Sequence, residues 1–576
     1  MSTSCGNPET EQDALMTRRT KFDKTKTCVK CKESRGNIVI RHAVYCKSCF
    51  FPLISTRFRK TLGPTINNKR GNKGANARGG RIKGLMQAPG SLVIGHSGGL
   101  GSTVLLDLVA KSYFYRSSTL SGQLPEDSLS LGSEHPRNRA RGEGDSGDVW
   151  KGTPAVCYVE VASVIPGAKE RTEEVRAAVK AYSDPTTGFE IDFIPLRLED
   201  AFDEGWWKTI GGTDLKQGAR DLGIDINDEA LPTLRQGSNI PTTPLQSLHT
   251  YLSSLPTPTA IHSAISSLIR VLLLFTAASR DASHLLLGTS LTSLSMNMIS
   301  GIAQGAGFAM VSEGLEEAWI GKNDQNISIV RPLRDIGIKE SAFWAWWSNL
   351  PVPGRDRYPS SVSSVPLGSE TAASRVAVKQ NQKLTSIDVL TQDFIMGLEK
   401  DFPSTVSTIA RTLAKVTTKE KGVSGGCVVC QKPAQPDVQA WKASISIRSY
   451  HDEAFVKSKH PLPPHFTSPP DAGVSAASSP TNGLAPRLCY SCHTTFTSRS
   501  SRGIASANEV VVPLPVWVKA SLPRSSEDTT VPESKDLQTG SNEDVAQAEL
   551  WETKKLSRGS IKDKIGAFLL DDAGDE

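Results

Sequence analysis

The chain has 576 residues, enough for two to four domains, and its apolar fraction of 38% is low for a chain that folds throughout. The net charge is only +6, but residues 1–84 carry 19 Lys and Arg against 5 Asp and Glu, a balance of +14. This excess indicates a polyanionic partner, nucleic acid first, with a solvated basic tail as the alternative. Residues 1–27 are polar and lack the apolar segment of a secretory signal, so we expect a soluble protein that is not exported.

Composition shifts divide the chain into modules. In chain order we expect a disordered N-terminus (1–24), a zinc module (25–55), a basic linker (56–86), an α/β domain (87–349) with a disordered insertion (116–152), a linker (350–385), a C-terminal helical and zinc module (386–519) with a disordered insertion (458–487), and a mostly disordered tail (520–576) that ends in an amphipathic helix.

Four Cys-x-x-Cys pairs account for eight of the ten cysteines. Cys28/Cys31 and Cys46/Cys49 are separated by 14 residues, a spacing at which two thiolate pairs can close a tetrahedral zinc site. A disulfide framework fits badly in a long chain without a secretion signal, and a thioredoxin-like motif would be a single pair within a βαβ unit. We predict a structural zinc ion here.

The second set of pairs lies near the C-terminal end. Cys427/Cys430 and Cys489/Cys492 are separated by 58 residues, many of them in a Pro/Ser/Ala-rich segment. Since the entropy of loop closure grows only logarithmically with length, an insertion of this size is compatible with one site. We predict a second structural zinc ion.

The segment after the first zinc module is strongly basic. From Phe51 to Gly84 it has nine Lys and Arg and no acid, and part of it is the glycine-rich KRGNKGANARGGRIKG. Such a segment can follow a phosphate backbone. The predicted RNA contacts are Arg57, Arg59, Lys60, Lys69, Arg70, Lys73, Arg78, Arg81 and Lys83.

A glycine-rich turn opens the α/β domain. The apolar run at 92–94 predicts a buried strand, and the spacing of Leu105, Leu108 and Val109 predicts a helix that begins near Ser102. A strand-to-helix turn of this kind presents backbone N–H groups at the positive end of a helix, which suits phosphate. It is not a P-loop, because the Gly-x-x-x-x-Gly-Lys-Ser/Thr pattern is absent.

Strands and helices alternate through the rest of this domain. We expect strands at 155–161, 189–196 and 284–287 and helices at 173–182 and 260–279, followed by an apolar-faced helix at 387–399. The uncharged run 282–312 divides at Gly288-Thr289-Ser290 and predicts a buried strand and helix and not a membrane span. The fold class is therefore α/β, with a doubly wound, mostly parallel sheet.

The turn Ser97-Gly98-Gly99-x-x-Ser102 resembles the pyrophosphate loop of the ATP pyrophosphatase (PP-loop, adenine nucleotide alpha hydrolase-like) superfamily. The flanking zinc pairs narrow the resemblance to its tRNA 2-thiolation branch. Residues 285–300 resemble the second nucleotide-side turn of that branch, and residues 331–340 resemble its late core motif. Residues 402–415, the Cys489/Cys492 pair and the segment IGAFLLDD resemble the second-subunit family of the cytoplasmic tRNA 2-thiolation heterodimer. The resemblance implies a nucleotide loop, intact or degenerate, made of Ser97, Gly98, Gly99, Ser102, Thr103, Gly288, Thr289 and Ser290, and ATP as the cofactor of an intact loop.

Two departures from that superfamily concern catalysis. Gly101 stands where many active members carry an acid that assists magnesium, and Cys157 is the only cysteine between Cys49 and Cys427. Sulfur transfer needs a thiolate or a thiolate-held metal. The sequence therefore predicts no catalytic residue, and the resemblance implies the non-catalytic subunit.

What the resemblance implies for function is an accessory role in 2-thiolation of the wobble uridine of cytoplasmic tRNA (5-methoxycarbonylmethyl-2-thiouridine in tRNA Lys, Glu and Gln). The implied partners are a catalytic thiolase subunit, tRNA and a thiocarboxylated ubiquitin-related modifier (the urmylation system), with no membrane. Two alternatives stay open: an ATP-dependent uridine-adenylating sulfurtransferase, and a zinc-dependent RNA-binding scaffold without nucleotide.

Overall fold

The structure is a computed structural model. It describes residues 26–522 except for the ranges 41–42, 67–86, 115–148, 166–167, 184–189, 216, 236–242, 315–316, 322–324, 355–385, 414–425, 436–437, 439–440, 443–482 and 499–510. The predicted N-terminal tail, the C-terminal amphipathic helix and six of the predicted RNA contacts (Lys69, Arg70, Lys73, Arg78, Arg81 and Lys83) lie outside the described residues.

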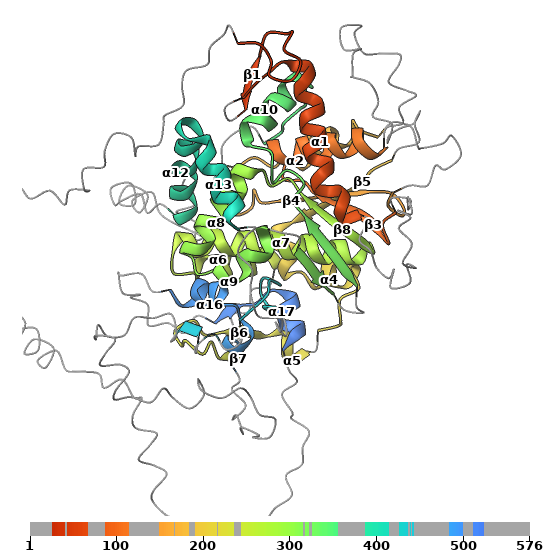
Figure 1. The fold of residues 1–576 in the computed structure, drawn as a ribbon. Helices are drawn as coiled ribbons and strands as arrows, with labels where there is room; N and C mark the ends of the chain where they lie inside the picture. Colours follow the sequence, from red (N-terminus) through yellow and green to blue (C-terminus); the bar gives the residue numbers. More distant parts are fainter. Residues whose placement is uncertain are drawn as a thin grey trace, which may run out of the picture. The chain divides into compact units, whose positions relative to one another are not determined.

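A six-stranded sheet forms the centre of the fold, in the order β5-β4-β3-β8-β10-β9 (Figure 1). Every neighbouring pair is parallel except β9 and β10, which are antiparallel. The predicted doubly wound, mostly parallel α/β sheet is confirmed. The strands are β3 (Ser91–Gly95), β4 (Ala155–Glu160), β5 (Asp192–Arg197), β8 (Ala282–Leu287), β9 (Glu317–Ile320) and β10 (Asn326–Val330).

Helices cover both faces of this sheet, because alternate strand residues point to opposite sides. On one face Leu285 and Ile329 share a core with α6 (Pro244–Ser253) and α7 (Pro258–Ser279). On the other face Leu286 and Val330 share a core with α1 (Lys47–Ile66), α2 (Leu100–Val109), α3 (Thr172–Lys180) and α10 (Ile338–Trp347).

The remaining elements are short or lie at the periphery of the sheet. The β1–β2 hairpin (Ile38–Ile40, Ala43–Tyr45) precedes α1, and α8 (Leu291–Ala303) contacts α9 (Gly307–Gly314), α12 (Ile387–Asp401) and α13 (Pro403–Leu413). The others are the π-helix η2 (Ala110–Phe114), the 3-10 helices η4 (Leu198–Phe202) and η7 (Ala485–Arg487), and α4 (Glu204–Thr209), α5 (Gln217–Arg220), β6 (Leu222–Ile224), β7 (Thr233–Arg235), α16 (Tyr490–Thr497), β11 (Val512–Pro513) and α17 (Val516–Ser521).

One helix among the described residues, α7, is long and apolar enough to cross a membrane by length and composition. Nine of its residues are buried, and all of them except Thr276 belong to the apolar core that α7 shares with the sheet. Thr257 caps its N-terminus with a side-chain hydrogen bond to the N–H of Ala260. This packing is that of a core helix.

Several predicted module boundaries need correction. Residues 56–66 are not linker but the second half of α1, whose apolar side is buried in the core. Trp150, inside the predicted insertion 116–152, is fully buried, and Leu484, inside the insertion 458–487, is buried too.

The C-terminal module is not separate from the α/β domain either. Its strand β11 pairs with β6 in a three-stranded antiparallel sheet in the order β11-β6-β7, so residues 512–513 complete a sheet that residues 222–224 begin. The apolar side chains of α16 and α17 join the same core as α7. Residues up to Leu522 form one compact unit.

Candidate functional site

The glycine-rich turn links β3 to α2, as the sequence predicts. Gly98 has φ +74°, a left-handed conformation that favours glycine, and Gly99 is the N-cap residue of α2. The hydroxyls of Ser102 and Thr103 both donate to the Gly99 carbonyl, at 2.9 and 3.0 Å. These two side chains therefore hydrogen-bond within the turn and stabilise its conformation.

The side chain of His96 makes a hydrogen bond to the backbone of this turn. Its Nδ1 accepts a hydrogen bond from the Gly98 N–H at 3.1 Å. The ring is buried, and burial lowers the pKa of His96 to about 4. The imidazole is neutral at neutral pH, as an acceptor at Nδ1 requires.

The predicted second turn, at residues 288–290, lies directly against the first because β3 and β8 are parallel neighbours. A Cβ on Gly101 would lie 2.1 Å from the Gly288 carbonyl oxygen, and one on Gly288 would lie 2.5 Å from the Ser102 nitrogen. Ser290 caps α8 by accepting a hydrogen bond from the Ser293 N–H at 3.2 Å. The structure thus brings the two turns together at backbone contact, with no room for a side chain at position 101.

A further segment reaches the first turn. The N–H of Gly354 donates to the Gly98 carbonyl at 2.9 Å, and Pro353 also lies beside Gly98. Residues 351–354 were predicted to begin a linker; instead they fasten the end of α10 to the β3 turn.

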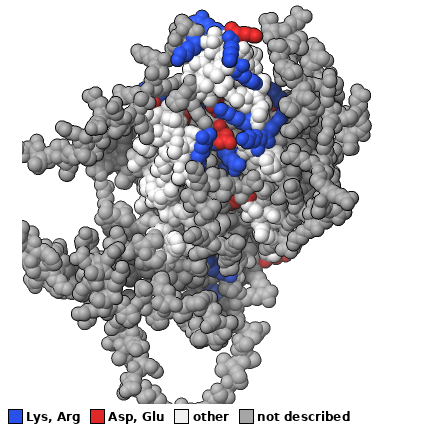
Figure 2. Space-filling view, viewed as in Figure 1, with Lys and Arg blue, Asp and Glu red and all other residues white. Residues whose placement is uncertain are grey.

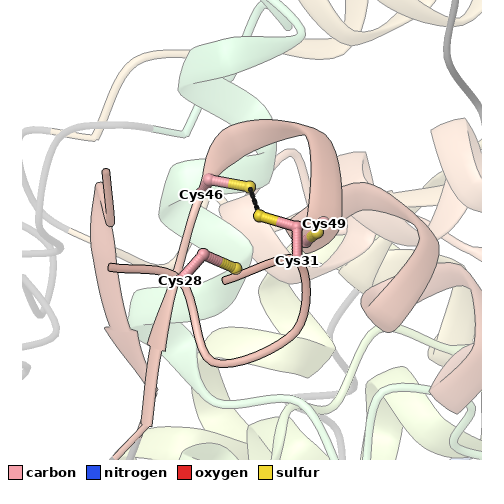
Figure 3. A group of neighbouring side chains, drawn as sticks. All are labelled: Cys28, Cys31, Cys46 and Cys49. Atoms are coloured by element: carbon pink, nitrogen blue, oxygen red, sulfur yellow. Dashed lines mark hydrogen bonds between the residues drawn. The ribbon is translucent and has the colours of Figure 1, made fainter. Parts of the chain in front are cut away.

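The four N-terminal cysteines converge, as predicted. Cys28 and Cys31 come from the loop before β1, Cys46 ends the hairpin and Cys49 lies in the first turn of α1 (Figure 3). Their sulfurs all lie within 4.8 Å of one another, and Cys31 Sγ is 3.8 Å from Cys46 Sγ. Hydrogen bonds from the backbone of Ser34 and Glu33 lower the pKa of Cys31 to about 6. This group could hold one metal ion.

The four C-terminal cysteines form a second group that is buried throughout. Cys427, Cys430, Cys489 and Cys492 place their sulfurs within 4.8 Å of one another, with Cys430 Sγ 3.7 Å from Cys489 Sγ. The 58-residue separation along the chain therefore does not prevent one site. This group too could hold one metal ion.

The basic residues predicted on α1 divide into two kinds. Arg59 and Lys60 are exposed, whereas Arg57 Nη1 lies 3.1 Å from Glu340 Oε1 and its side chain is only 24% exposed. Glu340 also accepts the N–H of Gly337 at the start of α10. Arg57 therefore links α1 to α10, and its role as an RNA contact stays a prediction.

The charge excess of residues 1–84 includes the first cysteine module, but the predicted RNA contacts named no individual residue of that module. Figure 2 shows Lys and Arg gathered where Figure 1 places β1, α1 and α10. A Lys or Arg at every few positions, beside the cysteines, was the available signal. Among the residues that the structure describes, the exposed basic residues of this module are Lys26, Lys30, Lys32, Arg35 and Lys47.

Cys157 lies in the middle of β4 and is fully buried. Burial raises the pKa of its thiol to about 12, outweighing the charge of Arg280. The described core thus offers no accessible thiolate between Cys49 and Cys427.

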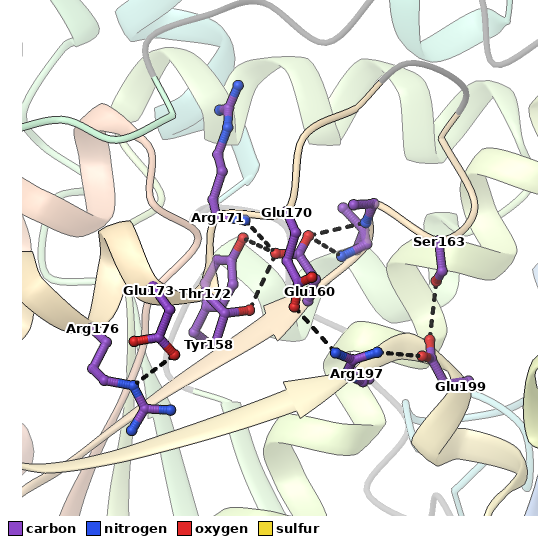
Figure 4. A network of polar contacts seen from close by, with 12 residues as sticks. Tyr158, Glu160, Ser163, Glu170, Arg171, Thr172, Glu173, Arg176, Arg197 and Glu199 are labelled. Atoms are coloured by element: carbon purple, nitrogen blue, oxygen red, sulfur yellow. Dashed lines mark hydrogen bonds and ion pairs between the residues drawn. The ribbon is translucent and has the colours of Figure 1, made fainter.

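The carboxyl end of β4 carries a buried carboxylate that sequence reasoning also missed. Glu160 accepts the N–H groups of Val161, Ala162 and Arg171 and the hydroxyl of Tyr158 (Figure 4). These donors hold the β4–α3 connection in place. A single Glu in an apolar strand gave no sequence signal for this network.

Comparison with known proteins agrees with the resemblance. Residues 386–494 match the family model for cytoplasmic tRNA 2-thiolation protein 2. The Xenopus tropicalis protein of that name is 26% identical over 442 residues, which cover 73% of this chain and 74% of the relative. The Homo sapiens protein of that name is 26% identical over 516 residues, which cover 84% of this chain and 89% of the relative. Over most of its length the chain is similar to proteins named cytoplasmic tRNA 2-thiolation protein 2.

A solved structure is also similar. The U34-tRNA thiolase NcsA from Methanococcus maripaludis, solved with its 4Fe-4S cluster, has 16% sequence identity and a TM-score of 0.36, covering 73% of this chain and 97% of its own. The family resemblance stated from the sequence is confirmed by the family model and the curated relatives.

Proposed function

We propose that the chain is the non-catalytic subunit of the cytoplasmic complex that 2-thiolates the wobble uridine of tRNA. The name of its homologues supports the process and the compartment. One observation carries the non-catalytic assignment, which is the burial of Cys157 in β4. A thiol with a pKa of about 12 is almost entirely protonated at neutral pH and cannot act as a sulfur nucleophile.

Two contacts argue against the alternative of an ATP-consuming enzyme. The Gly288 carbonyl occupies the position that an acidic side chain at residue 101 would need. The Gly354 N–H donates to the Gly98 carbonyl and Pro353 lies beside Gly98, so residues 353–354 fill space next to the β3 turn. The eight nucleotide-loop residues are therefore assigned to a structural turn.

We assign zinc to both cysteine groups. Four thiolates around one zinc ion at about 2.3 Å have sulfur separations of about 3.75 Å. The separations of 3.8 and 3.7 Å between Cys31 and Cys46 and between Cys430 and Cys489 fit this geometry. An iron–sulfur cube binds each thiolate to a different iron and separates them further. One zinc ion would join the two Cys-x-x-Cys pairs of each group, and with four thiolate ligands it would have no open coordination position.

The partners follow from the proposal that this chain is the non-catalytic subunit. The exposed basic residues of the N-terminal module and of α1 would bind the tRNA backbone. A catalytic thiolase subunit would supply the reactive thiolates, and a thiocarboxylated ubiquitin-related modifier would supply the sulfur.

The decisive experiment is single-turnover formation of 2-thiouridine from tRNA, ATP and a thiocarboxylated donor. This protein alone should give no product, and its complex with the catalytic subunit should be active. Cys157→Ser should leave the activity of the complex within about twofold, since a protonated buried thiol takes no part in the chemistry. Product from this chain alone, abolished by Cys157→Ser, would make it the sulfurtransferase.

Elemental analysis of the purified protein tests the metal assignment. We expect two zinc ions per chain, and one after Cys28→Ser or Cys489→Ser. Iron in place of zinc, or less than one zinc per chain, contradicts the assignment.

A further inference from the structure

Helix α10 carries an exposed tryptophan. Trp346 is 70% exposed, whereas Trp344 on the same helix is buried in the core. The ring of Trp346 stacks on that of Trp347, with centroids 6.2 Å apart and planes inclined by 26°. Phe343, one turn earlier, meets the Trp346 ring edge-on at 5.9 Å. These ring contacts orient the indole, while most of its surface remains accessible to a ligand.

The stack is anchored to the body of the protein through Trp347. The rings of Phe50 and Phe51 in α1 lie 5.1 and 6.1 Å from the Trp347 ring. Phe50 itself is fully buried. A side chain that is oriented in this way loses less conformational entropy when a ligand binds to it than a free side chain would. Trp346 is therefore arranged as a binding surface would be.

The helices that form this surface are basic. Together α1 and α10 carry five cations and a single acid, Glu340. The Glu340 carboxylate lies 3.1 Å from Arg57 Nη1, so one of the five cations neutralises it. Figure 2 shows Lys and Arg gathered where Figure 1 places β1, α1 and α10. A ligand that binds here meets a surplus of positive charge.

The aromatic side chains and the cations share one face of α10. Lys339, Phe343 and Trp346 are four and three residues apart, a spacing that places them in one row along the helix. The Nζ of Lys339 donates to the Val39 carbonyl of β1 at 2.9 Å. This hydrogen bond joins the row to the first cysteine module, whose exposed residues include several lysines.

We propose that Trp346 is a stacking platform for an unpaired base of RNA, with the phosphates of the same strand bound by the surrounding cations. A base supplies the flat π face that stacks on an exposed indole, and phosphates match the positive surplus. The inference rests on the proposed function for its ligand, tRNA. It adds that Trp346 selects unpaired segments, because bases inside a duplex have no free face.

Anisotropy titrations of the full-length protein with labelled RNA test this inference. Trp346→Leu keeps an apolar side chain but removes the ring, and it should weaken binding of a single-stranded oligoribonucleotide about fivefold or more. The slope of log K against log salt should not change, because no phosphate contact is lost. Both proteins should bind a blunt RNA duplex of the same length equally, and Trp346→Phe should retain most of the single-strand affinity.

Phe394→Leu on α12 is the matched control. Phe394 is 56% exposed, but α12 carries four acids and one lysine, so its surface does not suit RNA. This variant should bind both RNAs as the unmodified protein does. Absence of single-strand binding, equal binding by the unmodified protein and Trp346→Leu, or an equal loss on single strand and duplex would each overturn the inference.

A protein contact is the competing interpretation of an exposed tryptophan. Unchanged RNA binding in Trp346→Leu, together with loss of the complex with the catalytic subunit, would make this face a protein contact and overturn the inference. The titrations measure RNA binding and not thiolation, so the two proposals can fail separately. A chain that forms 2-thiouridine alone but binds single strands through Trp346 would overturn only the non-catalytic assignment.

Discussion

The buried imidazole of His96 links the geometry of the β3 turn to pH. Because burial lowers its pKa to about 4, the folded protein keeps the ring neutral where the unfolded chain, with a pKa near 6.5, becomes protonated. The unfolded chain therefore binds more protons between pH 6.5 and 4, and folding stability falls as the pH falls through this window. The full loss from this residue is about 3 kcal/mol.

We expect His96→Gln, which cannot titrate, to reduce the slope of unfolding free energy against pH between 6.5 and 4. Denaturant unfolding at several pH values measures it. His284, whose pKa burial also lowers, should leave a residual slope in the variant. Identical slopes for the two proteins would show that His96 does not titrate with the predicted shift.

Gly101 is constrained by close backbone approach. We expect Gly101→Ala to destabilise the protein by about 1–3 kcal/mol, because its Cβ would overlap the Gly288 carbonyl. Gly397→Ala in α12 is the control: nothing lies within 4 Å of its Cβ, and alanine should stabilise that helix by about 0.8–1 kcal/mol. Equal effects in denaturant unfolding would contradict the close approach of the two turns.

At the same scale, the sequence predicted which residues form the turn but not what faces them. Gly101 was recognised as a missing acid, while its contact with Gly288 depends on β3 and β8 being neighbours although residues as far apart as Leu92 and His284 pair in them. Arg57 is similar, since its partner Glu340 is 283 residues away and nothing local distinguishes it from Arg59. Long-range pairs of this kind leave no local pattern.

At the scale of elements, α1 combines a core face and a basic face. Phe50, Ile54, Phe58 and Leu62 are buried at a spacing of four residues, while Arg59 and Lys60 are exposed. The helical period was present in the sequence, but the following glycine-rich basic run led to the prediction of a linker. In α12 the expected apolar face is only partly buried: Ile395 is buried, but Leu390 and Phe394 are 57% and 56% exposed.

We expect Arg59→Ala with Lys60→Ala to weaken tRNA binding and to lower the slope of log K against log salt by about 0.7–0.9 per lost phosphate contact. Filter binding over a series of salt concentrations measures both. Lys180→Ala with Lys400→Ala, on exposed positions of α3 and α12, removes the same charge and should leave the slope unchanged. An unchanged slope in the α1 variant would mean that this face does not contact RNA.

At the scale of the whole molecule, the two cysteine groups differ in how they join the core. Cys427, Cys430, Cys489 and Cys492 belong to the same apolar cluster as α7 and the sheet, whereas the N-terminal cysteines belong to neither large cluster. From the composition we predicted a C-terminal module separate from the α/β domain, because the chain between the two is polar. That polar segment does not reveal that the C-terminal cysteines pack into the same core as α7.

We therefore expect Cys430→Ser to lower the midpoint of the main thermal transition, since metal binding and folding of the shared core are coupled. Cys31→Ser should act mainly on the N-terminal module and leave that midpoint nearly unchanged. Calorimetry measures the midpoint of the main transition in each variant, and limited proteolysis reports unfolding of the N-terminal module. Equal shifts for both variants would contradict this difference.

The pairing of β11 with β6 also sets the order of events during synthesis. Residues 222–224 are made 290 residues before their partners at 512–513, which takes about 15–60 s at ordinary elongation rates. During that interval the apolar surface that α16 and α17 later cover is open on the ribosome-bound chain. Chaperones that recognise apolar segments would have their longest contact with this protein there, and a premature stop before residue 512 would leave the surface permanently uncovered.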